Sequence, residues 1–267
     1  MAPTTTELPA ALAGLSSAFR LAYTPVEGSR DLVIALSHDL RLPFVRWQFR
    51  HNALLVADND ERYFMTATAE FLQALDGLVD SFDRVLFCGF SKGGFGALML
   101  AALAAARRRD RKWRALAFSP QTRLAADSSA MFYPSARRMV VEAQRSPRLQ
   151  RRLDVFGDVS RLYDWPNLQA ILVYPLRNVT DTEAAHALIR PNVRLYPLPF
   201  MMHNTLFPFV LKGRGPEVML QRLEKLYTTN DPDMVASRPA NLRQIAEDVC
   251  RTTWLPGFND LLDEALG

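Results

Sequence analysis

The 267-residue sequence has only two cysteines, Cys88 and Cys250, and no long hydrophobic run. Two cysteines cannot form a disulfide framework or a four-ligand structural zinc site, which favours a reducing compartment. No stretch reaches the roughly 20 apolar residues that cross a bilayer. The N-terminus also lacks the basic start and apolar core of a secretion signal. We therefore expect a cytoplasmic protein without a membrane span.

The chain has little net charge outside one short basic run. Its formal net charge is +4, and residues 107–114 alone carry six basic side chains against one acid, Asp110. This run follows an apolar stretch, residues 97–106, in which a helix would end, and cations are favourable near a helix C-terminus. No basic stripe or recognised binding motif accompanies it. We therefore expect no nucleic-acid partner.

Hydrophobic residues make up 49% of the chain and charged residues 22%, as in ordinary soluble globular proteins. Short apolar segments alternate with longer helical ones, which predicts an α/β fold with a mostly parallel central sheet and helices on both faces. The expected strands are residues 31–37, 52–57, 84–88, 114–118, 169–174 and 192–197, with a weaker one at 19–24. The expected helices are residues 66–79, 92–107, 182–189 and 216–227.

Two segments fall outside this alternation. Residues 121–165 separate two strands by far more than a crossover requires, and long insertions of this kind often cover a site. We expect them to form a helical, lid-like insertion within an α/β domain of residues 1–230. Residues 231–267 begin within the sequence Thr-Thr-Asn-Asp-Pro and are expected to add two short helices packed on the same domain.

The most informative segment is residues 89–93, Gly-Phe-Ser-Lys-Gly, which matches the nucleophile-elbow pattern G-x-S-x-G. An apolar strand precedes it, and a helix rich in small residues, including Gly94 and Gly96, follows it. Ser91 would sit on a turn tight enough to push its hydroxyl off the sheet, and large side chains beside it would collide with backbone. A glycine-rich turn can also bind phosphate or only pack, but neither the P-loop spacing nor G-x-G-x-x-G is present.

This segment resembles the α/β-hydrolase superfamily. It is most similar to a bacterial branch in which an elbow like Gly-Phe-Ser-Lys-Gly-Gly precedes a strand ending in Ser-Pro-Gln, here residues 119–121. In this branch an earlier strand ends in aspartate shortly before an aromatic residue, as Asp58 and Tyr63 do. The resemblance covers roughly residues 31–213 and implies a fold and a serine nucleophile, but no particular substrate.

The superfamily's chain order of serine, acid and histidine implies a base that follows Ser91. Only His186 and His203 do so. His203 comes just after the last expected strand, where the family places its base, and we expect it to be catalytic. His186 lies inside a helix-like segment and is expected to face solvent or to pack.

The acid is expected after the strand at residues 169–174. Asp181 follows it, directly before a helix, and would hold His203 in the correct tautomer. Its alternative role is that of a helix cap. Glu183 is a nearby competitor, and Asp127 is an alternative placement after the preceding strand.

The oxyanion hole requires two backbone N–H donors. Lys92, directly after the nucleophile, would supply one, and the loop that begins at Ser37 would supply the other. The ring of His38 in that loop could also donate, although an ordinary loop histidine is as good a reading. The Lys92 side chain is expected to point into solvent. No cluster has metal-ligand spacing, and we expect neither a metal nor a cofactor.

These residues predict a serine hydrolase that cleaves a carboxylic ester through an acyl-enzyme on Ser91. The substrate would be a small-molecule or glycan ester. One alternative is an acyltransferase that passes the acyl group to a sugar hydroxyl, since relatives of this branch occur around bacterial surface-glycan modification. Another is an inactive α/β-hydrolase fold that serves as a binding protein. The oligomeric state is not predicted.

Overall fold

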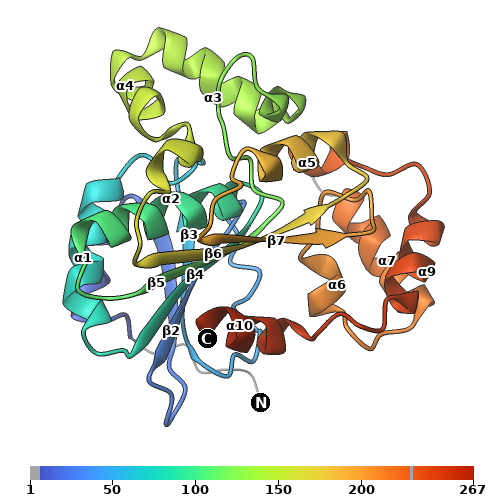
Figure 1. Cartoon of the computed structure of the whole chain (residues 1–267), viewed down its shortest axis with the longest axis horizontal. Coiled ribbons are helices and arrows are strands. Elements are labelled where there is room, and N and C mark those ends of the chain that lie inside the picture. Colours follow the sequence, from blue (N-terminus) through green and yellow to red (C-terminus); the bar gives the residue numbers. More distant parts are fainter. Residues whose placement is uncertain (1–6, 229–230) are drawn as a thin grey trace.

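The computed structural model describes residues 7–228 and 231–267 (Figure 1). Its centre is a seven-stranded sheet with the order β1-β3-β2-β4-β5-β6-β7. β1 runs antiparallel to β3, and the other neighbouring pairs are parallel. The strands are β1 (Phe19–Thr24), β2 (Asp31–Leu36), β3 (Asn52–Asp58), β4 (Arg84–Phe90), β5 (Trp113–Phe118), β6 (Leu168–Pro175) and β7 (Val193–Leu198).

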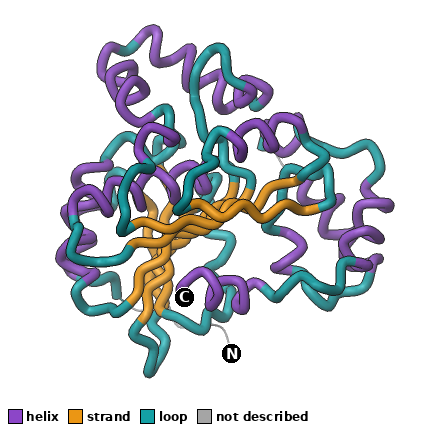
Figure 2. Tube along the Cα trace, in the orientation of Figure 1, coloured by secondary structure: helices purple, strands orange, loops and turns teal. Residues whose placement is uncertain are grey.

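Every residue of β2 and β3 is buried, as expected for central strands that are covered on both faces. Two hydrophobic clusters cover the sheet, one on each face. One cluster includes residues of the 3₁₀ helix η1 (Ala10–Leu15), α1 (Thr68–Val79) and α2 (Lys92–Arg107). The other includes residues of α6 (Phe207–Val210), α7 (Pro216–Tyr227), α9 (Leu242–Arg251) and α10 (Phe258–Leu266). Figure 2 shows these helices around the central strands, and the predicted α/β architecture is confirmed.

The expected helix at residues 182–189 begins earlier than predicted, as α5 (Val179–His186). The reason is a local cap, because the Asn178 side chain accepts a hydrogen bond from the Asp181 backbone N–H. A capping side chain does not change the hydrophobic periodicity from which the helix is predicted. The first turn of α5 is therefore not part of the predicted helix.

Residues 121–165 contain two helices, α3 (Pro134–Arg145) and α4 (Pro147–Phe156), and two 3₁₀ turns, η2 (Ser129–Phe132) and η3 (Val159–Leu162). Both helices stand away from the sheet at the top of Figure 1. Each begins with a proline at its first position, where the missing N–H removes no hydrogen bond. The insertion is therefore helical, as expected.

The segment from residue 231 onward contains three short helices rather than the expected two: α8 (Pro232–Ala236), α9 and α10. α8 is the unexpected one, and the Asp231 side chain caps it by accepting from the Asp233 and Met234 backbone N–H groups. Phe258 of α10 is buried in the cluster beneath the sheet. The segment thus contributes to the core that the strands build.

Within the described residues, no helix combines the length and the hydropathy that a membrane crossing would require.

Candidate active site

Ser91 lies between the end of β4 and the start of α2, with φ 53° and ψ −116°. Residues other than glycine rarely adopt a positive φ, so the backbone at Ser91 is strained. Two hydrogen bonds hold it: the Ser91 N–H donates to the Phe118 carbonyl at 2.9 Å, and the Phe95 N–H donates to the Ser91 carbonyl at 2.9 Å. The neighbouring strand β5 and the first turn of α2 therefore fix the direction of the Ser91 side chain.

The glycines on either side of Ser91 are required by space. A Cβ at position 89 would overlap the Gly93 carbonyl, and a Cβ at position 93 would overlap the Leu36 carbonyl at the end of β2. Since both obstacles are backbone atoms, no side-chain movement relieves the overlap. This close approach is the local reason for the G-x-S-x-G pattern.

Ser91, His203 and Asp181 lie within hydrogen-bonding distance in series. The Ser91 Oγ is 3.0 Å from His203 Nε2, and His203 Nδ1 is 2.9 Å and 3.0 Å from the two Asp181 carboxylate oxygens. His203 follows β7, and Asp181 lies in the first turn of α5. All three are nearly inaccessible, with exposed fractions of 3%, 0% and 2%. The structure thus brings together the three residues that the sequence singled out.

The competing residues lie elsewhere. Asp127 is exposed and forms an ion pair with Arg123 at 2.8 Å. Glu183 is exposed and lines a cleft that Asp181 also lines, but it makes no hydrogen bond or ion pair with Ser91 or His203 among the described residues. His186 is also exposed, with its Nε2 3.4 Å from the Tyr174 hydroxyl. None of the three approaches Ser91 or His203 among the contacts of the described residues.

Tyr133 joins this group, although the sequence offered no signal for it beyond an apolar position in the insertion. Its hydroxyl donates to Asp181 Oδ1 at 2.8 Å and lies 2.8 Å from His203 Nδ1. Burial, and after it the Asp181 charge, raises the pKa of Tyr133 well above its ordinary value. The hydroxyl therefore keeps its proton.

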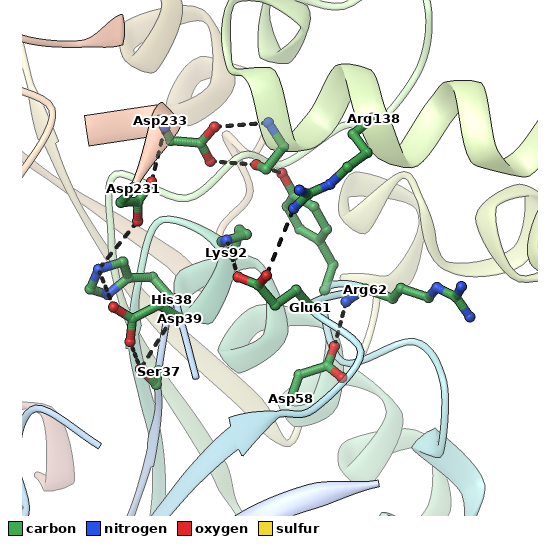
Figure 3. Close-up of polar contacts among 12 residues, drawn as sticks. Ser37, His38, Asp39, Asp58, Glu61, Arg62, Lys92, Arg138, Asp231 and Asp233 are labelled. Atoms are coloured by element: carbon green, nitrogen blue, oxygen red, sulfur yellow. Dashed lines mark hydrogen bonds and ion pairs between the residues drawn. The ribbon is translucent and has the colours of Figure 1, made fainter. Parts of the chain in front are cut away.

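Lys92 is the first residue of α2, so its backbone N–H has no partner within the helix. That N–H makes no backbone hydrogen bond among the described residues, and its role as an oxyanion donor stays a prediction. The expectation for its side chain is wrong: the ammonium group is buried and lies 3.2 Å from the Glu61 carboxylate (Figure 3). Pairing with Glu61 compensates for the loss of solvent around the buried charge.

Glu61 lies in a strained loop that follows β3. The Asp58 carboxylate at the end of β3 accepts three backbone N–H groups, from residues 60, 62 and 64. Glu61, Tyr63 and Phe64 have positive φ angles of 52°, 57° and 63°. Burial raises the pKa of Asp58 above its ordinary value, and the three N–H donors oppose that rise. The carboxylate thus compensates for the strain of a loop that would otherwise not hold this shape.

The ring of His38 contacts one aromatic ring and two carboxylates. It packs edge-on against Phe90, with ring centroids 5.1 Å apart, and its Nε2 is 3.7 Å from carboxylate oxygens of both Asp39 and Asp231 (Figure 3). The His38 backbone N–H makes no hydrogen bond to another described residue. The backbone, rather than the ring, stays the candidate donor.

His38, Asp39 and Asp231 are also the one group of three among the described residues whose ligand atoms lie close enough, within 4.8 Å, to hold a metal ion. Both carboxylates already have partners. Asp39 accepts from the Arg41 guanidinium at 2.6 Å, and Asp231 caps α8. The donor set is therefore satisfied without a metal.

Two clefts border the site, and Ser91 lines neither of them. A cleft of about 210 Å³ runs beside Asp181 and Tyr133. A larger one, of about 550 Å³, adjoins Lys92 and has mostly charged walls. Its lining residues are Asp39, Leu40, Arg41, Glu61, Lys92, Arg138, Thr228, Asp231 and Pro232.

Comparison with known proteins identifies the fold. No protein-family model matches the chain, and no curated protein matches it. Among solved structures it is similar to carboxyl esterase 2 from the fungus Tuber melanosporum, with a TM-score of 0.56 and 13% identity over 99% of this chain and 88% of that one. The Francisella virulence factor BioJ has a TM-score of 0.53 and 14% identity, over 94% of this chain and 86% of that one. Esterase B from Lactobacillus rhamnosis has a TM-score of 0.51 and 12% identity, over 99% of this chain and 88% of that one. The chain therefore has the α/β-hydrolase fold.

The space around Gly93 in the elbow and Gly77 in α1 predicts that their substitutions by alanine change the free energy of unfolding in opposite directions. Gly93→Ala places a methyl group on the Leu36 carbonyl, and we expect it to lower the free energy of unfolding by about 3 kcal/mol. Gly77→Ala, inside α1 with its nearest neighbour at 3.6 Å, should raise it by about 0.5–1 kcal/mol. Urea titrations of both variants measure the effects. A Gly93→Ala protein as stable as the wild type would contradict the close approach.

The environment of His38 predicts a pH effect on stability. Burial lowers the pKa of His38 below its ordinary 6.5, and the nearby Asp39 and Asp231 only partly oppose it. The unfolded chain therefore binds more protons below pH 6.5, so this residue makes the free energy of unfolding rise as the pH approaches 6.5. His38→Gln should make that rise shallower in urea titrations between about pH 5 and 7. The exposed His186→Gln is the control, and equal slopes in both variants would refute the effect.

Proposed function

We propose that this α/β-hydrolase-fold protein hydrolyses carboxylic esters through an acyl-enzyme on Ser91. The proposal rests above all on one observation, the hydrogen-bonded series from Ser91 Oγ through His203 to Asp181, with separations of 3.0 Å and 2.9 Å. Nucleophilic acyl transfer requires a hydroxyl that can attack, a base that faces this hydroxyl, and an acid that orients the base. The names of the structurally similar proteins, several of them esterases, agree with it.

In the proposed reaction, His203 Nε2 accepts the proton of the Ser91 hydroxyl as its oxygen attacks the ester carbonyl. The resulting oxyanion forms at the positive end of α2, where the backbone N–H groups of Lys92 and His38 would donate to it. The tetrahedral intermediate collapses, and the imidazolium returns its proton to the departing alcohol. Water then repeats the sequence on the acyl-enzyme, releasing the acid and restoring Ser91.

Asp181 has two tasks in this scheme. As an acceptor beside Nδ1 it keeps the proton on that nitrogen, which leaves the Nε2 lone pair facing Ser91. Its negative charge also stabilises the imidazolium that forms during attack. Because the acid is 2% exposed, water screens this interaction little.

The charged walls of the cleft beside Lys92 support a polar leaving group over a long hydrocarbon chain. We propose that this cleft receives the alcohol portion of a small ester. Ser91 is only 3% exposed, and we propose that an element covering it moves to admit the ester. We assign that task to residues 121–165, acting as a lid on the domain of residues 1–230, because this insertion contributes both Tyr133 beside the acid and Arg138 at the cleft.

A fluorophosphonate probe tests the nucleophile. Wild-type protein should gain one probe mass on the peptide that contains Ser91, and Ser91→Ala should gain none and lose about 10⁴-fold or more of the hydrolysis rate of short p-nitrophenyl esters. Ser119→Ala is the matched control, because Ser119 is also buried with a positive φ of 43° but pairs with Thr205.

Unlabelled wild-type protein, or equal labelling of Ser91→Ala, would end the proposal. Product that forms only when a hydroxyl acceptor is added would instead point to acyl transfer. If the protein is labelled but hydrolyses none of the short esters, Ser91 remains the proposed nucleophile and the short esters are excluded as substrates.

The acid is tested by comparing three carboxylates. Asp181→Asn should lower kcat by roughly 10³- to 10⁴-fold, since an amide can stabilise the wrong tautomer and no longer carries charge. Asp127→Asn and Glu183→Gln should retain wild-type kcat, because both side chains are exposed. A steady-state assay on one ester suffices, and a large loss in either control variant would refute the assignment of the acid.

A further inference from the structure

A fourth residue, Tyr133, forms hydrogen bonds within the group of Ser91, His203 and Asp181, and it comes from the insertion. Tyr133 lies between η2 and α3, within the insertion, and its side chain is fully buried. Its ring lies against that of His203, with centroids 4.5 Å apart, and its hydroxyl contacts both His203 and Asp181 at 2.8 Å. A segment far from the elbow in the sequence thus reaches the base and the acid together.

The protons in this cluster can be assigned. Asp181 offers only acceptor oxygens, and the Tyr133 hydroxyl has one proton, which it donates to Asp181 Oδ1. The remaining lone pairs of the phenol oxygen face His203 Nδ1 at 2.8 Å. The Nδ1 proton therefore points among three acceptors, namely the two carboxylate oxygens and the phenol oxygen.

The Asp181 carboxylate depends on Tyr133. Among the described residues its hydrogen-bond partners are His203 and Tyr133 alone. A buried charge needs such donors to stay ionised and in place. The His203 ring gains and loses charge at Nε2 during the proposed reaction, whereas Tyr133 remains a neutral donor to Asp181 throughout.

The segment that carries Tyr133 is itself anchored. Two residues further on, the Ser135 N–H donates to Asp233 at 2.8 Å, and the Ser135 hydroxyl also donates to this carboxylate. The Tyr63 hydroxyl lies 2.6 Å from the same serine oxygen. Figure 3 shows Asp233 of α8 directed toward this segment at the start of α3. Two buried partners of Ser135, Asp233 and Tyr63, therefore hold the segment that carries Tyr133 in this position.

We propose that Tyr133 is a positioning residue that holds the Asp181 carboxylate, and through it the His203 ring, in line with Ser91. Its kinetic consequence rests on the proposed function, whereas the hydrogen bonds themselves belong to the resting protein. Because Tyr133 belongs to the insertion, the base is aligned only while that insertion is seated over the site.

Another tyrosine provides a matched control. Tyr163 lies in the same insertion and is 1% exposed, but its buried hydroxyl has no hydrogen-bond partner among the described residues. Tyr133→Phe and Tyr163→Phe each remove one buried oxygen and keep the ring. Only the first removes a hydrogen bond to Asp181.

The kinetic test compares these two variants on one ester. We expect Tyr133→Phe to lower kcat about 10- to 100-fold, the size expected for a hydrogen bond to a charged group, with KM within about twofold of the wild type. Tyr163→Phe should retain both constants. Circular dichroism verifies that each variant is folded.

The spectroscopic test uses the resting protein and needs no substrate. The proton on His203 Nδ1 gives a far-downfield ¹H NMR resonance, assigned by its absence in His203→Gln. In Tyr133→Phe this proton loses the phenol oxygen and is attracted to the carboxylate alone, so the resonance should move further downfield. In Tyr163→Phe it should not move.

The two tests separate the failures. A wild-type protein without ester activity or probe labelling, but with the shifted resonance in Tyr133→Phe, would refute the proposed function and leave the hydrogen-bond network standing. A resonance that stays in place would overturn the proposed role of Tyr133 even if kcat falls, because the loss would then come from packing. A wild-type kcat in Tyr133→Phe would overturn it as well.

Discussion

The backbone of Ser91 is held in a conformation that few L-residues adopt, and two neighbouring strands hold it there. β5 accepts the Ser91 N–H through the Phe118 carbonyl, while the end of β2 lies so close that position 93 has no room for a side chain. The strain is compensated by the parallel sheet as a whole, since it requires three strands to end at the same level. The position of the hydroxyl is thus a property of the fold and not of the turn alone.

Burial then decides what the rest of the site must supply. Asp181 is a carboxylate with almost no contact with solvent, so its charge must be stabilised by hydrogen bonds from the protein. One donor is His203, and the other is Tyr133 from the insertion. The same low exposure that strengthens the interaction between Asp181 and His203 therefore makes the site depend on an element that does not belong to the sheet.

Sequence reasoning found the residues of the candidate site where the fold leaves a local pattern in the chain. The elbow could be identified because its glycines are adjacent in the chain, and His203 because the last strand ends just before it. Tyr133 could not, since nothing near it in the sequence distinguishes a phenol that bonds an acid from one that fills a core, as Tyr163 does. The Lys92 side chain was misjudged for a related reason: its partner, Glu61, is distant in the chain and arrives through a strained loop.

That loop gives a physical role to one feature of the sequence resemblance, the aspartate that ends a strand shortly before an aromatic residue. The Asp58 carboxylate binds the N–H groups of a loop whose backbone angles are unfavourable without it. The loop in turn places Glu61 against Lys92 on one side and the Tyr63 hydroxyl against Ser135, at the start of α3, on the other. One buried carboxylate at the end of β3 therefore shapes both the wall of the charged cleft and the seat of the segment that carries Tyr133. The elbow and the insertion, which are separate in the sequence, meet through this loop.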